Sequence, residues 1–186
     1  QHLITDDVWA RQRAEYGYRD VRPSPLLINF CGHPYIDIRA CLNSFIPSDI
    51  PDPLASRLVN AYLEQLKATP HLHDKVEFAV AFTCLTFDFD RQSRRLSDGG
   101  FSANDIAALK ESLRSITREA IKRGNREMET IRLMEARCRR LLASDMAPLD
   151  RAYALLDDCR RFGTLPFAHL ARNAFVAESL LRSIEA

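Results

Sequence analysis

The chain has 186 residues, of which 46% are apolar, and its 26 basic and 25 acidic side chains leave a formal net charge of +1. This length and apolar content fit one globular domain, with room for two small subdomains, and exclude a disordered or collagen-like chain. The balanced charge disfavours nucleic acid as the main partner. No apolar run approaches the roughly 18–20 residues of a membrane span, so we expect a cytoplasmic protein without a membrane partner.

The five cysteines contain no CxxC pair and no spacing typical of metal ligands. Their odd number and apolar neighbours predict free, buried thiols in a reducing cytosol. The chain starts at Gln1 directly before a predicted helix and stops at Ala186 directly after a long amphipathic segment. We therefore expect it to be part of a longer protein.

The first forty residues predict a helix followed by a hairpin. Thr5 can cap a helix over residues 6–16. The turn-like sequence 31–34 separates two strand-like segments, 26–30 and 35–42, which we expect to pair in an antiparallel hairpin.

A second helix and a long strand are predicted next. The Pro-rich break at 48–53 ends in Asp-Pro, which suits the start of a helix that continues to Lys67. The buried stripe of this helix is predicted at Leu54, Leu58, Tyr62 (with Val59) and Leu66. Residues 76–89 are rich in Val, Phe and Thr, with bulky and small side chains in alternation. That pattern favours a long central strand that is covered on both sides.

Four amphipathic helices are predicted in the second half, and their short connections favour antiparallel packing. The first begins at a capping box formed by Ser102 and Asp105 and ends at Gly124. The other three span residues 127–142, 148–162 and 164–184. We therefore predict a helix-dominated α+β fold, in which a small, mainly antiparallel sheet in residues 1–90 packs with a four-helix region in residues 91–186.

Sequence motifs for nucleotide chemistry are missing. The chain contains no GxxxxGK[ST], GxGxxG, HExxH or GxSxG sequence, and only six glycines. Loops that bind phosphate need glycines so that backbone amides can approach the anion. The sequence therefore encodes no complete catalytic apparatus of this kind.

Three stretches carry a resemblance to a known family. They read YGYRDVRPSPLLINFCGHPYIDIRACLNSFIP, LVNAYLEQLKATPHLHDKVEF and GTLPFAHLARNAF. Over nearly the whole chain, from about Leu3 to Ile184, the sequence resembles the middle section of large bacterial proteins similar to phosphoenolpyruvate synthase and pyruvate phosphate dikinase. The resemblance is specific to one subgroup, described as containing a PEP/pyruvate-binding domain.

This resemblance implies a multi-domain phosphotransferase, in which an ATP-grasp domain phosphorylates a histidine on a mobile domain. The Gly-rich signature that ends in Ser-His and the ATP-binding glycines and lysine are absent here, so the resemblance implies no cofactor for this chain, with ATP and Mg²⁺ bound by the parent protein. The flanking ATP-grasp and phosphohistidine domains are the implied partners. The implied role of this chain is to bind a small anionic acceptor, and the chain is expected to be inactive on its own. The alternative is a structural spacer or interaction module without a small-molecule site.

Residues 35–47 offer a first candidate site. If they form a strand, the odd positions place Asp37, Arg39 and Asn43 on the face opposite to the apolar one. An arginine can hold a carboxylate or phosphate through two parallel hydrogen bonds, while Asp37 and Asn43 orient the ligand. The alternative is an exposed sheet face on which Asp37 and Arg39 pair with little effect on stability.

Glu77 is a second candidate, because it begins the predicted buried strand and a carboxylate there needs a partner. We expect Arg39 to be that partner; the alternative is a carboxylate hydrogen-bonded at the sheet edge. The nearby His71 and His73 have no third strong metal ligand with them, so we predict no metal site.

The last helix carries His169, Arg172 and Asn173 at positions i, i+3 and i+4. We expect them to face the sheet and to complete a polar pocket with Arg39. A solvated helix face, or hydrogen bonds between helices, is the alternative. The aromatic side chains at the other end of the chain, Trp9, Tyr16 and Tyr18, are interpreted as packing residues.

Overall fold

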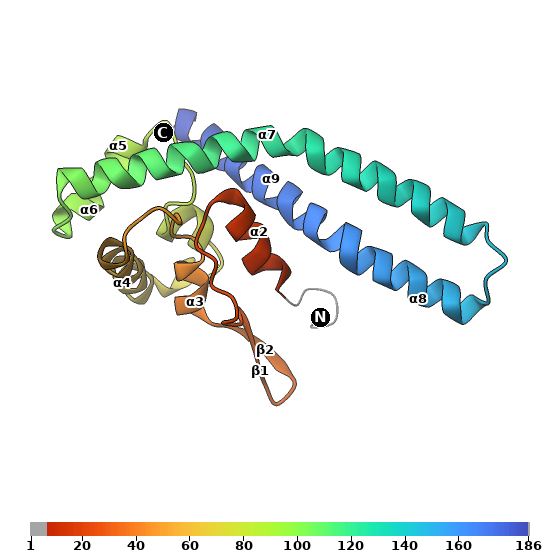
Figure 1. The fold of residues 1–186 in the computed structure, drawn as a ribbon. Coiled ribbons are helices and arrows are strands. Elements are labelled where there is room, and N and C mark those ends of the chain that lie inside the picture. Colours follow the sequence, from red (N-terminus) through yellow and green to blue (C-terminus); the bar gives the residue numbers. More distant parts are fainter. Residues whose placement is uncertain (1–6, 186) are drawn as a thin grey trace.

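The computed structural model describes residues 7–185, apart from the side chain of Asn125. It has the predicted helix-dominated α+β fold, with a two-stranded antiparallel sheet in the first half (Figure 1). The elements are α2 (Val8–Tyr16), β1 (Leu27–Phe30), β2 (His33–Ile36), α3 (Ile38–Asn43), α4 (Asp52–Ala68), η1 (Pro70–Leu72), η2 (Val76–Val80), α5 (Phe89–Gln92), α6 (Arg94–Asp98), α7 (Ala103–Leu142), α8 (Pro148–Asp158), η3 (Cys159–Gly163) and α9 (Thr164–Glu185).

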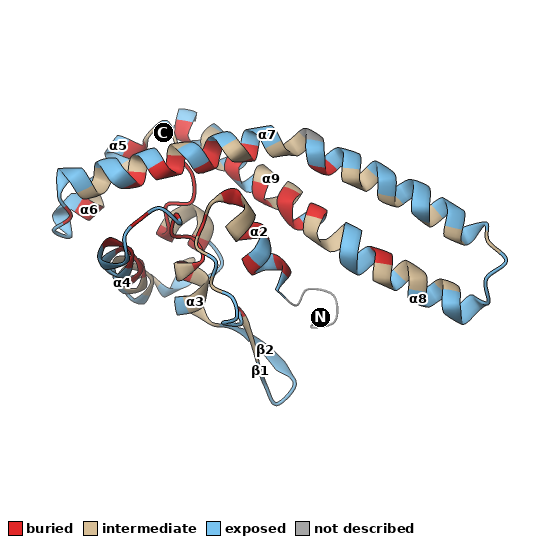
Figure 2. Ribbon diagram, viewed as in Figure 1, coloured by how far each residue is buried: buried red, intermediate tan, exposed pale blue. Residues whose placement is uncertain are grey.

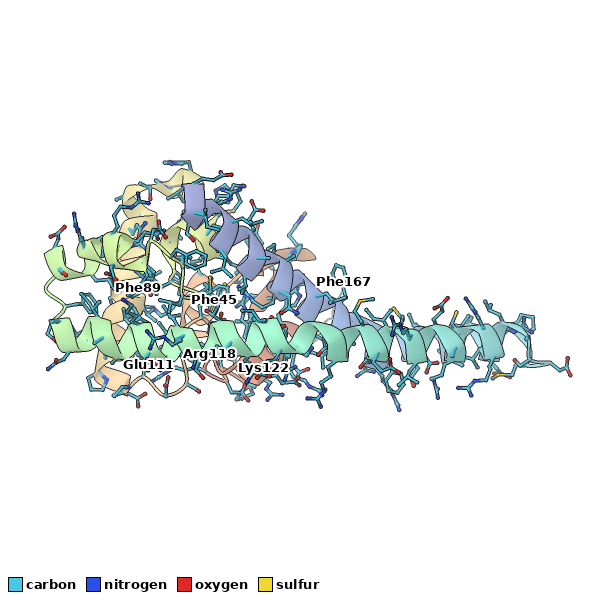
Figure 3. All side chains as sticks on the ribbon, turned by 90° about the horizontal axis from the view of Figure 1, so that it is seen from above. Phe45, Phe89, Glu111, Arg118, Lys122 and Phe167 are labelled. Carbon is cyan, nitrogen blue, oxygen red and sulfur yellow. The ribbon has the colours of Figure 1, made fainter. Side chains whose placement is uncertain are left out.

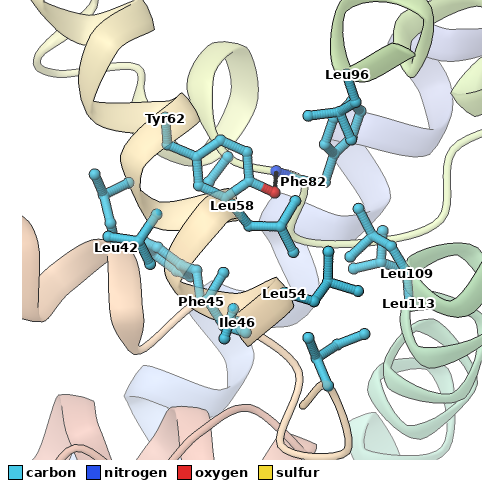
Figure 4. Packing of buried hydrophobic residues seen from close by; sticks show 14 of the residues in the cluster. Leu42, Phe45, Ile46, Leu54, Leu58, Tyr62, Phe82, Leu96, Leu109 and Leu113 are labelled. Atoms are coloured by element: carbon cyan, nitrogen blue, oxygen red, sulfur yellow. Dashed lines mark hydrogen bonds between the residues drawn. The ribbon is translucent and has the colours of Figure 1, made fainter. Parts of the chain in front are cut away.

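The main hydrophobic core lies between α3, α4, η2 and the first half of α7 (Figure 4). The predicted stripe of α4 is buried at Leu54, Leu58 and Tyr62. Leu109 and Leu113 of α7 pack against the same cluster, in the amphipathic pattern that the sequence predicted. These contacts fix α4 and η2 against the start of α7.

The hairpin is shorter than predicted. Leu27 pairs with Ile36, and the second strand ends there. The prediction of strand up to residue 42 is wrong, because Asp37 caps α3 by accepting a hydrogen bond from the amide of Ala40 at 2.9 Å. A local side-chain cap of this kind offers the backbone a helical alternative to a strand.

The predicted long strand at 76–89 is also wrong. Residues 76–80 form a π-helical turn, in which the amide of Ala81 donates to the carbonyl of Val76 at 2.9 Å. Side chains rather than a neighbouring strand satisfy the next carbonyl groups. Gln65 and Arg95 donate to the carbonyl of Ala79 at 2.8 and 3.0 Å. Among the described residues no strand lies beside this segment, so it does not form the hydrogen bonds between strands that its composition predicted.

Helix α7 is one continuous helix of 40 residues. Its predicted start is confirmed: Ser102 and Asp105 form a capping box. Its predicted end at Gly124 is wrong, because an interior glycine costs a helix only about 1 kcal/mol and packing against α9 exceeds that cost.

The return path from α8 through η3 to α9 is also continuous, so Gly163 does not end a helix. The segment 121–165, which we call the arm, projects as two antiparallel helices from the rest of the molecule (Figure 1). Its surface is mostly exposed or half-buried (Figure 2). Two long helices thus stand where the sequence predicted four shorter ones.

Thr5 and Asp6, at the predicted start of the first helix, lie outside the described residues. Of the five free cysteines only Cys84 is buried, so the prediction of buried thiols is wrong for Cys31 and Cys159, which are exposed. Within residues 7–185, no helix is both long enough and apolar enough to cross a membrane.

Candidate anion-binding site

Three charged side chains from distant parts of the sequence meet beside the core. Arg13 comes from α2, Glu77 from η2 and Arg172 from α9. Nη2 of Arg172 lies 2.9 Å from Oε2 of Glu77, and Nη2 of Arg13 lies 3.6 Å from Oε1 of the same carboxylate. One carboxylate therefore faces two guanidinium groups. We call this group the two-arginine site.

Arg13 is held in place by α3 and the turn after it. Its Nη1 donates to the hydroxyl of Ser44 and lies 3.6 Å from Sγ of Cys41. Its guanidinium stands 3.8 Å above the ring of Phe45, within the range of a cation–π contact. Only 8% of the side chain is exposed, so the charge is fixed in a desolvated position.

Arg172 is the more deeply buried arginine, with 3% of its side chain exposed. Three aromatic rings surround its guanidinium, those of Phe45, Phe175 and Tyr18, at 5.1, 5.7 and 5.9 Å. Its Nε and Nη1 have no hydrogen-bond partner among the described residues. A buried donor without a partner is costly unless a ligand satisfies it.

Two cavities adjoin the two-arginine site. The larger has a volume of about 520 Å³ and the smaller about 350 Å³. Both are lined by Trp9, Arg13, Glu77 and Phe175. Arg172 lines the smaller cavity, and two nitrogens of its guanidinium are buried there without a hydrogen-bond partner in residues 7–185.

Most of the buried side-chain atoms that lack a hydrogen-bond partner on the described residues lining the smaller cavity are donors, and Oε2 of Glu77 is the acceptor among them. Gln12 lines this cavity together with Arg172, and Nε2 of Gln12 is likewise buried without a partner in the described part of the chain. At the rim of the larger cavity, Asp74 is neutralised by Lys75 at 2.9 Å. The site therefore keeps an excess positive charge, which suits an anion.

The smaller cavity reaches the surface at Phe167, whose ring is 70% exposed. Figure 3 shows this side chain projecting from α9, whereas Phe45 lies within the body of the molecule. An apolar, partly open wall therefore connects the buried charges to solvent.

Of the residues that the sequence predicted, Glu77 and Arg172 come together in this site, but Arg39 does not. Arg39 is exposed and donates to Oδ1 of Asn60 at 3.2 Å. The predicted pairing of Glu77 with Arg39 is therefore wrong. Arg13, which sequence reasoning missed, takes that role.

The predicted polar strand face does not exist, because its residues lie in and before α3. Asp37 is used as the helix cap, and Nδ2 of Asn43 donates to the carbonyl of Arg39 at 3.0 Å. Neither residue lines the two cavities at the two-arginine site.

His169 belongs to a separate buried network between α2, α7 and α9. Its Nδ1 lies 2.8 Å from Oε1 of Glu127, and its Nε2 lies 3.3 Å from Oε2 of Glu15. Burial lowers the pKa of His169 below its ordinary value, and the nearby Arg123 acts in the same direction. The predicted pocket of His169 with Arg39 is wrong.

Asn173 also belongs to this interhelical contact, as the sequence alternative allowed. Its Oδ1 accepts a hydrogen bond from the hydroxyl of Tyr16 at 2.6 Å. Burial raises the pKa of Tyr16 above its ordinary value, so this phenol stays protonated and acts as a donor. Tyr16 and Asn173 therefore fix α2 against α9, close to the two-arginine site.

Across residues 7–185, no group of three or more His, Cys, Asp and Glu side chains forms a possible metal centre. Comparisons of the chain with protein-family models, with curated proteins and with solved structures give no match. Any function assigned to the chain therefore rests on its own residues and on the sequence resemblance described above.

Proposed function

We propose that the chain binds a small organic anion at the two-arginine site and serves as the acceptor-binding section of a phosphotransferase similar to phosphoenolpyruvate synthase. The observation that carries the proposal is the unbalanced charge beside an open cavity. Two buried guanidinium groups share one carboxylate, and the more deeply buried one has two nitrogen atoms without a hydrogen-bond partner in residues 7–185. A ligand that accepts hydrogen bonds there would offset the cost of leaving these buried donors without a partner.

The surroundings of the charges support binding rather than catalysis. The cavity walls are mostly aromatic and aliphatic, with a few convergent polar groups, as in typical ligand pockets. In the family that the sequence resembles, an ATP-grasp domain phosphorylates a histidine on a mobile domain. In this proposal the flanking ATP-grasp and phosphohistidine domains of the parent protein supply ATP, Mg²⁺ and the phosphoryl group, and this section presents the acceptor.

Thermal unfolding tests the binding step. A panel of small anions, including pyruvate, phosphoenolpyruvate, inorganic phosphate and phenylacetate, is added to the chain. At about 100 times its dissociation constant, a true ligand stabilises the native state by about 2.7 kcal/mol, which raises the melting temperature by roughly 5–10 °C. Arg172→Leu should abolish the rise.

Arg39→Ala is the matched control, because it removes an exposed arginine outside the two cavities. The rise should persist in this variant. Failure of every anion in the panel to shift the melting temperature, or an equal loss of the shift in both variants, would contradict the proposal.

The phosphotransferase context needs its own test. An antibody against this chain, applied to its source cell, should detect a protein several times larger than 21.2 kDa. That protein, once purified, should transfer phosphate from ATP to an acceptor. A native protein near 21.2 kDa would remove the flanking domains from the proposal.

A second function, the docking of a neighbouring domain, is favoured by the arm. Leu149 and Tyr153 on α8 are 69% and 67% exposed, and Leu133 on α7 is 61% exposed. Apolar side chains gathered on an exposed element are typical of interaction surfaces. If the arm docks a flanking domain, Leu149→Glu should abolish the association of the chain with those domains without changing anion binding.

A further inference from the structure

We infer that the ligand of the two-arginine site is a monocarboxylate with an aromatic or branched apolar body, rather than a phosphate ester or a small polar acid. This inference rests on the proposed function, because it specifies which anion the site takes. Charge, donor arrangement and cavity walls each contribute to it.

The net charge of the site favours a ligand with a single negative charge. The guanidinium groups of Arg13 and Arg172 contribute two positive charges, and Glu77 removes one of them. A carboxylate monoanion therefore makes the desolvated site neutral. A phosphate ester, which carries close to two negative charges near pH 7, would leave a net negative charge in a place largely shielded from water.

The buried donors beside the smaller cavity favour a ligand that accepts hydrogen bonds, as a carboxylate does. Nε and Nη1 of Arg172 and Nε2 of Gln12 are buried donors without a partner in residues 7–185, and both residues line the smaller cavity. A carboxylate has two oxygens with about four acceptor positions. One such group can therefore accept from one edge of the Arg172 guanidinium and from the amide of Gln12, which relieves part of the cost of leaving these donors without a partner.

The cavity walls select an apolar body. Trp9 and Phe175 line both cavities, and Phe45 and Phe78 add aromatic surface to the larger one. The volumes, about 520 and 350 Å³, lie within the usual range for organic ligands. A two- or three-carbon acid would leave most of this apolar surface without contacts, whereas a phenyl or branched alkyl group fills it.

Trp9 makes the inference directly measurable, because it is the chain's one tryptophan and lines both cavities. Its fluorescence therefore comes from one position beside the site. The titration uses 3-phenylpropionate, with three matched comparisons: acetate without the ring, 3-phenylpropanol without the charge, and phenyl phosphate with a doubly charged head. The expected result is binding of 3-phenylpropionate at least tenfold tighter than of any comparison compound.

Two variants locate the binding. Arg172→Leu should weaken 3-phenylpropionate at least tenfold, and Gln12→Leu should weaken it several-fold, while Arg39→Ala leaves it unchanged. Circular dichroism of each variant establishes that it is folded, and the Gln12 variant keeps all three charges of the site in case the Arg172 variant does not fold. Equal losses in the Gln12 and Arg39 variants would overturn the inference.

The outcomes separate the two proposals. If phenyl phosphate or acetate binds as tightly as 3-phenylpropionate, and Arg172→Leu abolishes that binding, the ligand class is wrong and the anion site stands. If none of the three anions changes Trp9 fluorescence or the melting temperature, the proposed function fails together with this inference.

Discussion

Glu77 is the shared counter-charge of two buried arginines, so replacing it should cause a large loss of stability. Replacing it by Gln leaves the guanidinium groups of Arg13 and Arg172 in a desolvated space without a counter-charge. Breaking a buried ion pair in this way costs about 3–5 kcal/mol, and we expect the lower end because the carboxylate is 23% exposed. Urea unfolding of Glu77→Gln measures this loss.

Replacing Arg172 should cost less stability than replacing Glu77. Arg172→Leu removes one partner of a buried ion pair but leaves Glu77 paired with Arg13, so the free energy of unfolding should fall by less than it does in Glu77→Gln. The same variant should lose anion binding. A loss of stability as large as that of Glu77→Gln would show that Arg172 is structural, which would contradict a role in binding.

His169 predicts a pH dependence of stability. Its pKa is lowered in the folded state, so below about pH 6.5 the unfolded chain binds a proton that the folded chain does not. The free energy of unfolding therefore carries no penalty from His169 above this pH, and it falls as the pH drops toward the pKa of His169 in the folded state. The melting temperature should fall between pH 7.5 and 5.5, and less steeply in His169→Gln.

Glu15, which also contacts His169, does not titrate in that window. Burial raises the pKa of Glu15, but its hydrogen bonds with Arg11 and Arg123 outweigh this effect, so the pKa lies below its ordinary value and the carboxylate stays ionised above pH 5.5. His71→Gln, at an exposed position, is the control. An equal slope in the wild type and in the His169 variant would contradict the assignment.

At the scale of elements, Gly124 is the clearest test of the continuous helix α7. A Cβ built there lies 3.7 Å from Nδ2 of Asn173, which is an ordinary contact, and the position is helical. Gly124→Ala should therefore stabilise the chain by about 0.5–1 kcal/mol. If α7 broke at Gly124 instead, alanine would destabilise it. Gly163→Ala is the comparison. It should gain less stability, because a Cβ there would lie only 3.2 Å from Sδ of Met134, which is a tight contact.

The elements that could be predicted are those set by local chemistry. The amphipathic stripe of α4 and the capping box before α7 need only nearby residues, and both appear as expected. The segment 76–89 depends on a distant partner: with no strand beside it in the described chain, its carbonyls bond to Gln65 and Arg95. Its alternation of bulky and small residues cannot reveal this.

The site was half predictable for the same reason. Glu77 and Arg172 stand out as charges in apolar sequence, and they do meet. Trp9 and Arg13 are four residues apart on one face of α2, a spacing that is equally typical of packing and of a ligand wall. The contact of α2 with both η2 and α9, through Arg13 and Tyr16, is a tertiary fact that no local pattern contains.

At the scale of the whole molecule, the arm and the body should differ in local stability. Between residues 121 and 165 no described apolar side chain is buried, whereas 103–120 of the same helix contribute Leu109, Leu113 and Ile116 to the cores. Amide hydrogens of 128–160 should therefore exchange faster than those of 106–118. Hydrogen exchange with mass spectrometry measures the difference, and equal protection would contradict a thinly packed arm.

In the body of the molecule, α2, η2 and α9 meet around the buried, charged two-arginine site. The central claim is that the two-arginine site binds a monocarboxylate with an apolar body. A crystal structure with 3-(4-bromophenyl)propionate tests this claim most directly. The account predicts an anomalous bromine peak between Trp9 and Phe175, with the carboxylate within hydrogen-bond distance of Arg172. A bound ligand whose bromine and carboxylate lie away from Arg13, Glu77 and Arg172 would contradict it.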